Sequence, residues 1–260
     1  MSFPRSPRVL YRQNPLDLVI GQLRFPPILK IEAELPFAFQ DAVRTRYPNF
    51  RTRRQADVFP EALRHLVVGA GMGMPGGSMS HEFLSADGFW TVSLSRESIS
   101  VSNAKYTRWE EFREHFHFVI GVLEREYSPA FYSRIGLRYR DVVRREKLGL
   151  LETPWASLLN PYIAGELGAP ELLGKIQYAA RDFVVPLEGV NGSVRVQHGL
   201  GQEVPDGKPV YFIDSDFFTD ERTEVANALE VLDAFNGRAG DLFRWCISPD
   251  LHNAMEPVPI

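Results

Sequence analysis

Between Arg134 and Arg144 the chain alternates strictly between two kinds of side chain. Because successive side chains of a strand point to opposite sides, this stretch predicts a β-strand with one apolar face and one basic face. Asp141 is set into the apolar face. The apolar positions are Ile135, Leu137, Tyr139 and Val143, and the basic positions are Arg134, Arg138, Arg140 and Arg144.

Apolar residues at helical spacing predict three helices, over residues 36–47, 107–128 and 222–247. Thr107 and Glu110 form a capping-box pattern, so we expect Thr107 to cap the second helix. We expect Gly237 and Gly240 to mark a break in the third helix. Shorter apolar runs predict the remaining strands, at residues 16–25, 50–59, 63–68, 89–94, 98–103, 176–186, 193–198 and 210–217.

Both halves of the chain therefore have the order strand, helix, several strands, long helix. Runs of strands bounded by helices, without regular βαβ alternation, indicate an α+β fold with mostly antiparallel sheets, each packed on a long helix. We expect two lobes, residues 1–147 and 148–260, or one continuous domain. The order in each half resembles helix-grip and TATA-binding-protein-like architectures, although the two halves share no visible repeat of residues.

The composition indicates a well-packed globular protein. Of the 260 residues 44% are hydrophobic and 18 are phenylalanine, which excludes a disordered chain. The formal net charge of −4 argues against a nucleic-acid binder that acts through its overall charge, but it leaves room for a local basic groove. Residues 1–15 lack the apolar core of a signal peptide, and no run is long enough to span a bilayer. We expect a soluble protein of the cytoplasm.

Cys246 is the single cysteine, so no internal disulfide can form and a reducing compartment is favoured. A catalytic thiol needs an exposed and electropositive setting. The apolar neighbours Trp245 and Ile247 predict a buried, inert thiol instead.

Two further motifs have the form of a site but favour structural interpretations. Residues 71–76 match G-x-G-x-x-G, but a dinucleotide loop must open a helix and the sequence after Pro75 is strand-like, so we expect no cofactor. Asp214 and Asp216 share one face of a predicted strand and are weak candidates for metal ligands, because the sequence identifies no third ligand. The histidines are not clustered, which argues against zinc.

The basic face of the strand at 134–144 is the strongest functional signal. Its four guanidinium groups could clamp phosphate or carboxylate groups, or they could be solvated or paired with acids of neighbouring elements. A second basic cluster surrounds the predicted junction near residue 48. If the two clusters meet in space, a nucleic-acid or nucleotide groove becomes credible. The second cluster comprises Arg44, Arg46, Arg51, Arg53 and Arg54.

Residues 134–141, Arg-Ile-Gly-Leu-Arg-Tyr-Arg-Asp, are similar to the hallmark segment Arg-aromatic-Gly-Leu-Arg-Tyr-Ile-Asn of a sporadically distributed prokaryotic family. The chain departs from that segment at Ile135, Arg140 and Asp141. Residues 14–16, 22–27, 39–42 and 214–217 resemble the same family, so the resemblance spans nearly the whole chain. The family has no established activity to carry over, and its patchy distribution implies horizontally transferred loci, including anti-phage or toxin–antitoxin islands.

The leading interpretation is a non-enzymatic binding or interaction module, an accessory component of a mobile or anti-phage defence locus. Arg134, Arg138, Arg140 and Arg144 would bind an unidentified protein partner or an anionic ligand, with nucleic acid less favoured and membranes not involved. The alternative is a metal-dependent enzyme that acts on a phosphorylated or nucleic-acid substrate through Asp214 and Asp216. A third hypothesis is a small-molecule carrier with an apolar cavity.

Overall fold

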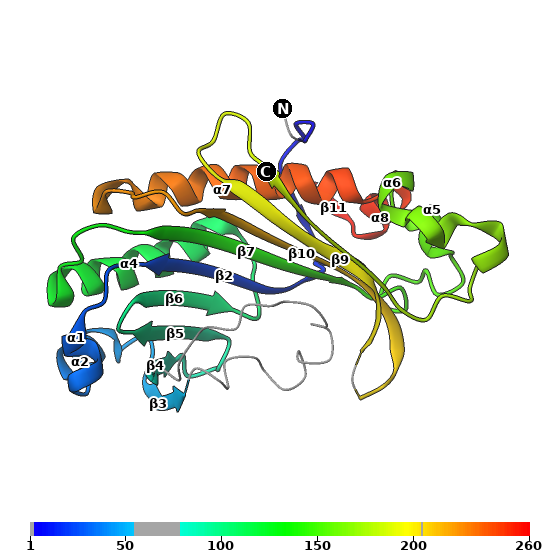
Figure 1. The fold of residues 1–260 in the computed structure, drawn as a ribbon. Helices are drawn as coiled ribbons and strands as arrows, with labels where there is room; N and C mark the ends of the chain where they lie inside the picture. Colours follow the sequence, from blue (N-terminus) through cyan, green and yellow to red (C-terminus); the bar gives the residue numbers. More distant parts are fainter. Residues whose placement is uncertain (1–2, 55–78, 204) are drawn as a thin grey trace. The chain divides into compact units, whose positions relative to one another are not determined.

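The computed structural model describes residues 3–54, 79–203 and 205–260 (Figure 1). The predicted strand at 63–68 and the glycine-rich motif at 71–76 lie outside the described residues, as does the second half of the strand predicted at 50–59. No helix in the described ranges is both long and apolar enough to cross a membrane.

Nine of the described strands form one large antiparallel sheet, which confirms the α+β class (Figure 1). They are β2 (Leu16–Arg24), β3 (Asn49–Arg54), β4 (Met79–Leu84), β5 (Trp90–Ser95), β6 (Ser98–Asn103), β7 (Arg134–Val143), β8 (Ala179–Pro186), β9 (Ser193–Glu203) and β10 (Lys208–Thr219). Their order across the sheet is β3-β4-β5-β6-β2-β7-β10-β9-β8. A separate pair joins β1 (Val9–Tyr11) to β11 (Pro257–Pro259). Sequence reasoning missed β1, β4 and β11.

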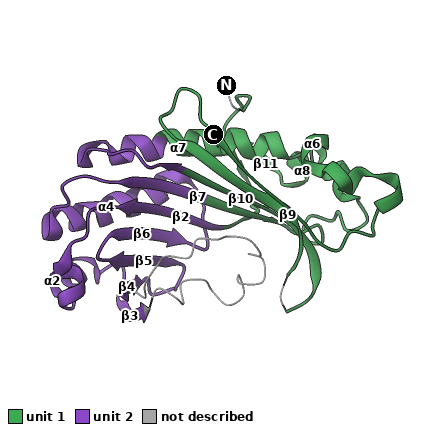
Figure 2. Cartoon of the chain, in the orientation of Figure 1, with its two compact units in different colours: residues 1–17, 139–217, 234–260 green, residues 18–138, 218–233 purple. Residues whose placement is uncertain are grey.

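The chain divides into two compact units, each assembled from separate segments (Figure 2). Unit 1 comprises residues 1–17, 139–217 and 234–260, and unit 2 comprises residues 18–138 and 218–233. The sequence suggests contiguous lobes that meet at residue 147, whereas these units interleave along the chain. Residues 134–138 of β7 belong to unit 2 and the rest of the strand to unit 1.

In unit 2 the helix α4 (Trp109–Tyr127) packs its aromatic side against the strands. Phe112 and Phe116 are each 1% exposed, and the rings of Trp109, Phe112 and Phe116 follow one another at centroid distances of 5.9 and 6.1 Å. Burying one such side chain stabilises a fold by about 1.5–3 kcal/mol. The predicted cap is wrong, because the residue before the helix is Arg108 and the Thr107 hydroxyl donates to Glu111 instead.

Gly21 allows α4 to approach β2 closely. A Cβ atom at this position would lie 2.6 Å from Cε2 of Phe116. We therefore expect Gly21→Ala to lower the free energy of unfolding by about 1–3 kcal/mol, the usual cost of overpacking a core. Urea denaturation measures this loss. Gly121→Ala on the exposed side of α4 is the matched control, because an added Cβ there meets no described atom within 4 Å apart from its chain neighbours and the backbone of its own helix. An equal loss there would contradict the explanation.

Unit 2 also contains α1 (Leu29–Ala33), α2 (Phe37–Val43) and a short 3-10 helix (Val225–Asn227). The helix predicted over 36–47 is therefore shorter than expected. It begins directly after Pro36, where a proline is tolerated, and residues 44–46 continue only as a turn. Tyr47 is 1% exposed, so its burial does not require helical structure.

Unit 1 contains most of α7 (Ala228–Cys246), which packs on β7 and β10. The Tyr139 hydroxyl donates to Oδ1 of Asn236 at 2.8 Å, and the rings of Phe217 and Phe235 lie 6.3 Å apart. The predicted break at Gly237 and Gly240 is wrong, because α7 runs through both residues. Burial of its neighbouring side chains outweighs the cost of about 1 kcal/mol for each glycine in a helix.

The connection between β7 and β8 in unit 1 holds α5 (Trp155–Leu158), α6 (Pro161–Ala164) and the 3-10 helices Gly165–Gly168 and Pro170–Leu172. Nδ2 of Asn160 donates to the carbonyl oxygens of Trp245 and Ile247 at 2.7 and 3.0 Å. It thereby satisfies carbonyl groups at the end of α7 that have no helical partner. The helix α8 (Pro249–Ala254) follows, capped by Ser248.

Candidate functional site

One face of the unit 2 sheet is lined by hydroxyl groups. Val101 of β6 pairs with Gly21, which faces α4. The residues next to Val101 on β6, and their partners on β5, therefore point to the opposite face of the sheet. The register pairs these residues directly across the two strands. The pairs are Thr91 with Ser102, Ser93 with Ser100, and Ser95 with Ser98.

These pairs extend into rows that cross five strands. Ser100 pairs with Gln22 of β2, Ser93 pairs with Glu82 of β4, and Glu82 pairs with Arg51 of β3. Strands lie about 4.8 Å apart, so this row spans roughly 19 Å. We define the polar face as Gln22, Arg24, Arg51, Arg53, Ser80, Glu82, Thr91, Ser93, Ser95, Ser98, Ser100 and Ser102.

The centre of the polar face has unused hydrogen-bonding groups. Within the described part of the chain, the side chains of Gln22, Ser93 and Ser100 are half-buried and make no hydrogen bond to another residue. The hydroxyls of Ser95 and Ser98, in contrast, lie 2.8 Å apart and satisfy each other. Hydroxyl and amide groups both donate and accept, so the three central side chains can bind a ligand.

An arginine–glutamate–arginine cluster lies at the β3 end of the polar face. Nε of Arg51 and Nε of Arg53 lie 2.5 and 3.4 Å from the same oxygen, Oε2 of Glu82. The Glu82 side chain is 8% exposed, whereas those of Arg51 and Arg53 are 45% and 33% exposed. The cluster therefore carries one excess positive charge, and its two arginines are the part that solvent reaches.

The first half of the predicted arginine strand belongs to the same unit. Arg134 and Arg138 alternate with Ile135 and Leu137, which are fully buried, so both arginines point away from the core, as the polar face does. Nη1 of Arg134 donates to Oδ1 of Asp220 at 2.8 Å, and its guanidinium lies 4.3 Å from the centroid of the Phe218 ring. Arg138 is half-buried.

The other two arginines lie in unit 1, where one is buried and the other is paired with acids. Arg140 is 5% exposed. Arg144 follows the last residue of β7, and its guanidinium donates to both carboxylate oxygens of Glu203 and, at 3.1 Å, to Asp17. The four arginines are therefore not one open stripe, although their role in binding stays a prediction.

Asp214 and Asp216 lie two residues apart on β10 in unit 1. Asp214 is 8% exposed and Asp216 is half-buried. Among the residues that the structure describes, no three His, Cys, Asp or Glu side chains come together in a way that could hold a metal ion. Within the described ranges, these two carboxyl groups therefore have no third carboxylate, thiol or imidazole beside them.

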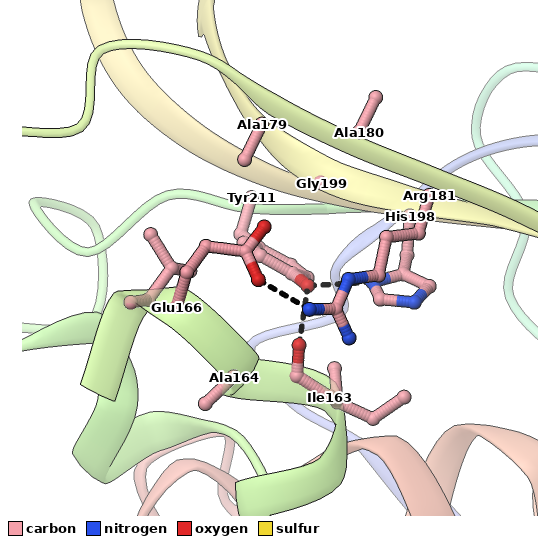
Figure 3. A pocket seen from close by; sticks show the side chains of 10 residues that line it. Ile163, Ala164, Glu166, Ala179, Ala180, Arg181, His198, Gly199 and Tyr211 are labelled. Carbon is pink, nitrogen blue, oxygen red and sulfur yellow. Dashed lines mark hydrogen bonds and ion pairs between the residues drawn. The ribbon is translucent and has the colours of Figure 1, made fainter. Parts of the chain in front are cut away.

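A small hollow in unit 1 holds a tyrosine–histidine pair (Figure 3). The Tyr211 hydroxyl lies 2.7 Å from Nδ1 of His198, and Arg181 pairs with Glu166 beside them. Burial raises the pKa of Tyr211 and lowers the pKa of His198 to about 4, so the two groups form a neutral hydrogen-bonded pair, and the hydroxyl donates to the Ile163 carbonyl oxygen at 3.4 Å. The hollow is about 10 Å³, room for one water molecule, so it does not supply the cavity of a carrier.

Two more tyrosines bind histidines in the same way. The Tyr47 hydroxyl lies 2.6 Å from Nδ1 of His115 in unit 2, and the Tyr11 hydroxyl lies 2.8 Å from Nδ1 of His252 in unit 1. Burial lowers the pKa of both histidines. These pairs satisfy partly buried polar groups and do not form a cluster.

Cys246 is the buried thiol that the sequence predicts. It is fully buried, and burial raises its pKa, which favours the unreactive protonated form. Its burial and its protonated state argue against a nucleophilic role.

The second basic cluster is only partly on the polar face. Arg44 and Arg46 pair with Asp41 and Glu114 at 3.5 and 3.1 Å, near the end of α2. Arg51 and Arg53, in contrast, belong to the polar face and to the same unit as Arg134 and Arg138. Arg54 is the last residue of β3. Three members of the second cluster and two of the first therefore lie in unit 2 on strands of one sheet.

Sequence reasoning missed the hydroxyl rows. The signal is visible as Thr-Val-Ser-Leu-Ser at 91–95 and Ser-Ile-Ser-Val-Ser at 98–102. Both stretches are predicted as strands, but serine and threonine are common on solvated strand faces and do not by themselves indicate a site. Only the register shows that their hydroxyls line up with Gln22, Glu82 and Arg51 from distant segments.

No protein-family model matches the chain, and no curated protein is significantly similar to it.

Proposed function

We propose that this protein is a non-enzymatic binding module whose polar face in unit 2 binds an anionic ligand or an acidic surface of a protein partner. The observation that carries the proposal is the row of hydrogen-bonding groups at Gln22, Ser93 and Ser100, which ends at arginines. Guanidinium and hydroxyl groups together donate to carboxylate and phosphate oxygens.

The charge of this surface supports the same ligand class. Arginines outnumber carboxylates among the described residues assigned to the polar face and to the adjoining part of β7. The arginines are Arg24, Arg51, Arg53, Arg134 and Arg138, and the carboxylates are Glu82 and Asp220, the latter bound to Arg134. A local excess of positive charge on a chain of net charge −4 favours the binding of anions at this surface.

Nucleic acid remains the less favoured ligand. Proteins that bind single strands stack the bases on aromatic side chains. No residue of the polar face, as defined above, is aromatic, and the nearby Trp90 ring lies against Phe112 of α4. An acidic polypeptide or a polyphosphate needs no such stacking.

The cellular role that we propose follows from the resemblance of residues 134–141 to a sporadically distributed prokaryotic family. We propose that the protein acts in the prokaryotic cytoplasm as an accessory component of a mobile or defence-associated locus. A module that recognises an acidic partner without catalysis suits such a role.

We expect the double variant Arg51→Gln/Arg138→Gln to bind anions at least about tenfold more weakly, because each charge-assisted hydrogen bond contributes about 1.5–3 kcal/mol. Fluorescence anisotropy with labelled poly-L-glutamate, and competition by inorganic tripolyphosphate, measures the change at low ionic strength. The control is Arg12→Gln/Arg125→Gln, which removes two exposed charges elsewhere. Absence of binding by the unmodified protein, or an equal loss in the control, would refute the proposal.

A further inference from the structure

We infer that Glu82 sets the specificity of the polar face by competing, as a tethered carboxylate, with the anionic ligand for Arg51 and Arg53. This inference rests on the proposed function and adds to it the residue that limits which anions bind. It also predicts the chemistry of the ligand. The ligand is a multivalent anion, which can accept more hydrogen bonds from these arginines than the single carboxylate of Glu82 does.

The contacts of Glu82 are those of a bound anion. Both arginines approach the same oxygen, Oε2, through their Nε atoms at 2.5 and 3.4 Å. A carboxylate on an external ligand would be recognised by the same donors. The site is therefore built for an oxyanion and already contains one that the chain itself supplies.

The position of Glu82 makes it a competitor and not merely a distant counter-ion. Its register partners are Arg51 on one side and Ser93 on the other, so it lies between the arginines and the hydroxyl row. A ligand that follows the row from Gln22 through Ser100 and Ser93 reaches Glu82 before it reaches the arginines. It must displace that carboxylate or meet its charge at close range.

The exposed fractions of the three side chains show where a ligand can displace Glu82 from the arginines. The carboxylate is 8% exposed, but the guanidinium side chains are 45% and 33% exposed, so an anion can reach them from solvent. Two half-exposed arginines on one carboxylate leave one positive charge uncompensated. A single small anion gains little by replacing Glu82, whereas a multivalent anion also gains the hydrogen bonds of Ser93, Ser100 and Gln22.

The test is Glu82→Gln, which keeps the size of the side chain and removes its charge. We expect this variant to bind inorganic tripolyphosphate and poly-L-glutamate at least about fivefold more tightly than the unmodified protein, measured by calorimetry and anisotropy. Glu114→Gln is the matched control, because it removes one carboxylate from an exposed pair with Arg46 and leaves the polar face intact. Its affinity should stay within about twofold of the unmodified protein.

Each outcome decides the inference. Equal or weaker binding by Glu82→Gln, with the unmodified protein still binding, would overturn it and assign Glu82 to holding the arginines in place. Absence of binding by both proteins would overturn the proposed function as well. If circular dichroism shows that Glu82→Gln does not fold, Glu82→Asp is the second test, because it withdraws the carboxylate by one methylene group. Tighter binding by Glu82→Asp supports the inference, and unchanged or weaker binding refutes it.

Discussion

The protonation of His198 is expected to lower the free energy of unfolding by roughly 3 kcal/mol as the pH falls from 6.5 to about 4. Burial in the hollow beside Tyr211 lowers the pKa of His198, so the folded state holds the ring neutral. The unfolded chain takes up a proton near pH 6.5. The contribution is therefore fully present above that pH and is lost as the pH falls through the folded value.

Urea denaturation at several pH values checks this expectation with His198→Gln, which keeps an acceptor near the Tyr211 hydroxyl and cannot titrate. Between pH 6.5 and 4, the free energy of unfolding of this variant should fall by roughly 3 kcal/mol less than that of the unmodified protein. His117→Gln, at an exposed position, is the control. A pH dependence identical in all three proteins would contradict the assignment.

The difference between variant and unmodified protein is the informative quantity. Burial also lowers the pKa values of His81, His115 and His252, so these residues add acid sensitivity of the same sign. Their contributions cancel in the comparison, because His198→Gln leaves their surroundings unchanged. We expect the largest single effect at His198, which is 2% exposed.

Replacing Asp141 with asparagine is expected to raise the free energy of unfolding at neutral pH by more than about 1 kcal/mol, which exceeds the usual effect of a surface substitution. Burial raises the pKa of Asp141 well above its ordinary value, and the charges of Asp214 and Asp17 raise it further. The folded protein therefore favours the uncharged carboxyl group. Asparagine has nearly the same shape and carries no charge, so it removes the cost of burying a carboxylate.

The pH dependence has the opposite sign to that of His198. The contribution of Asp141 is fully present below the pKa of the unfolded chain and is lost as the pH rises through the folded value. The advantage of Asp141→Asn should therefore grow from acid to neutral pH in urea denaturation. Asp206→Asn in an exposed turn is the control. A destabilised Asp141→Asn at neutral pH would show that the charged form is the one the fold requires.

Local sequence patterns predict much of the secondary structure. The alternation from Arg134 to Val143 and the aromatic spacing from Trp109 to Leu123 each correspond to an observed element, because strand and helix periodicity are local properties. Two of the three missed strands are short: β1 and β11 have three residues each, whereas β4 has six. These two strands are stabilised by pairing with each other. The local sequence of β1 near the N-terminus does not show that its partner β11 lies near the C-terminus.

The candidate site depended on information that is not local. The pattern correctly predicts that Arg140 and Asp141 point to opposite faces, but it does not show that both are 5% exposed. It likewise identifies Arg134 and Arg144 without Asp220 and Glu203, which lie far along the chain. Pairing between distant segments therefore decided which arginines form ion pairs with acids.

By itself, the sequence determined the alternating faces of β5, β6 and β7, the buried thiol of Cys246 and the α+β class, because each follows from the order of apolar and polar residues over a few positions. Only the tertiary structure decided that Gln22, Ser93, Ser100 and Glu82 share one row. The physical reason is the register of strands: hydrogen bonds between backbones bring side chains from residues 22 to 100 within reach, and no property of the separate segments specifies that alignment.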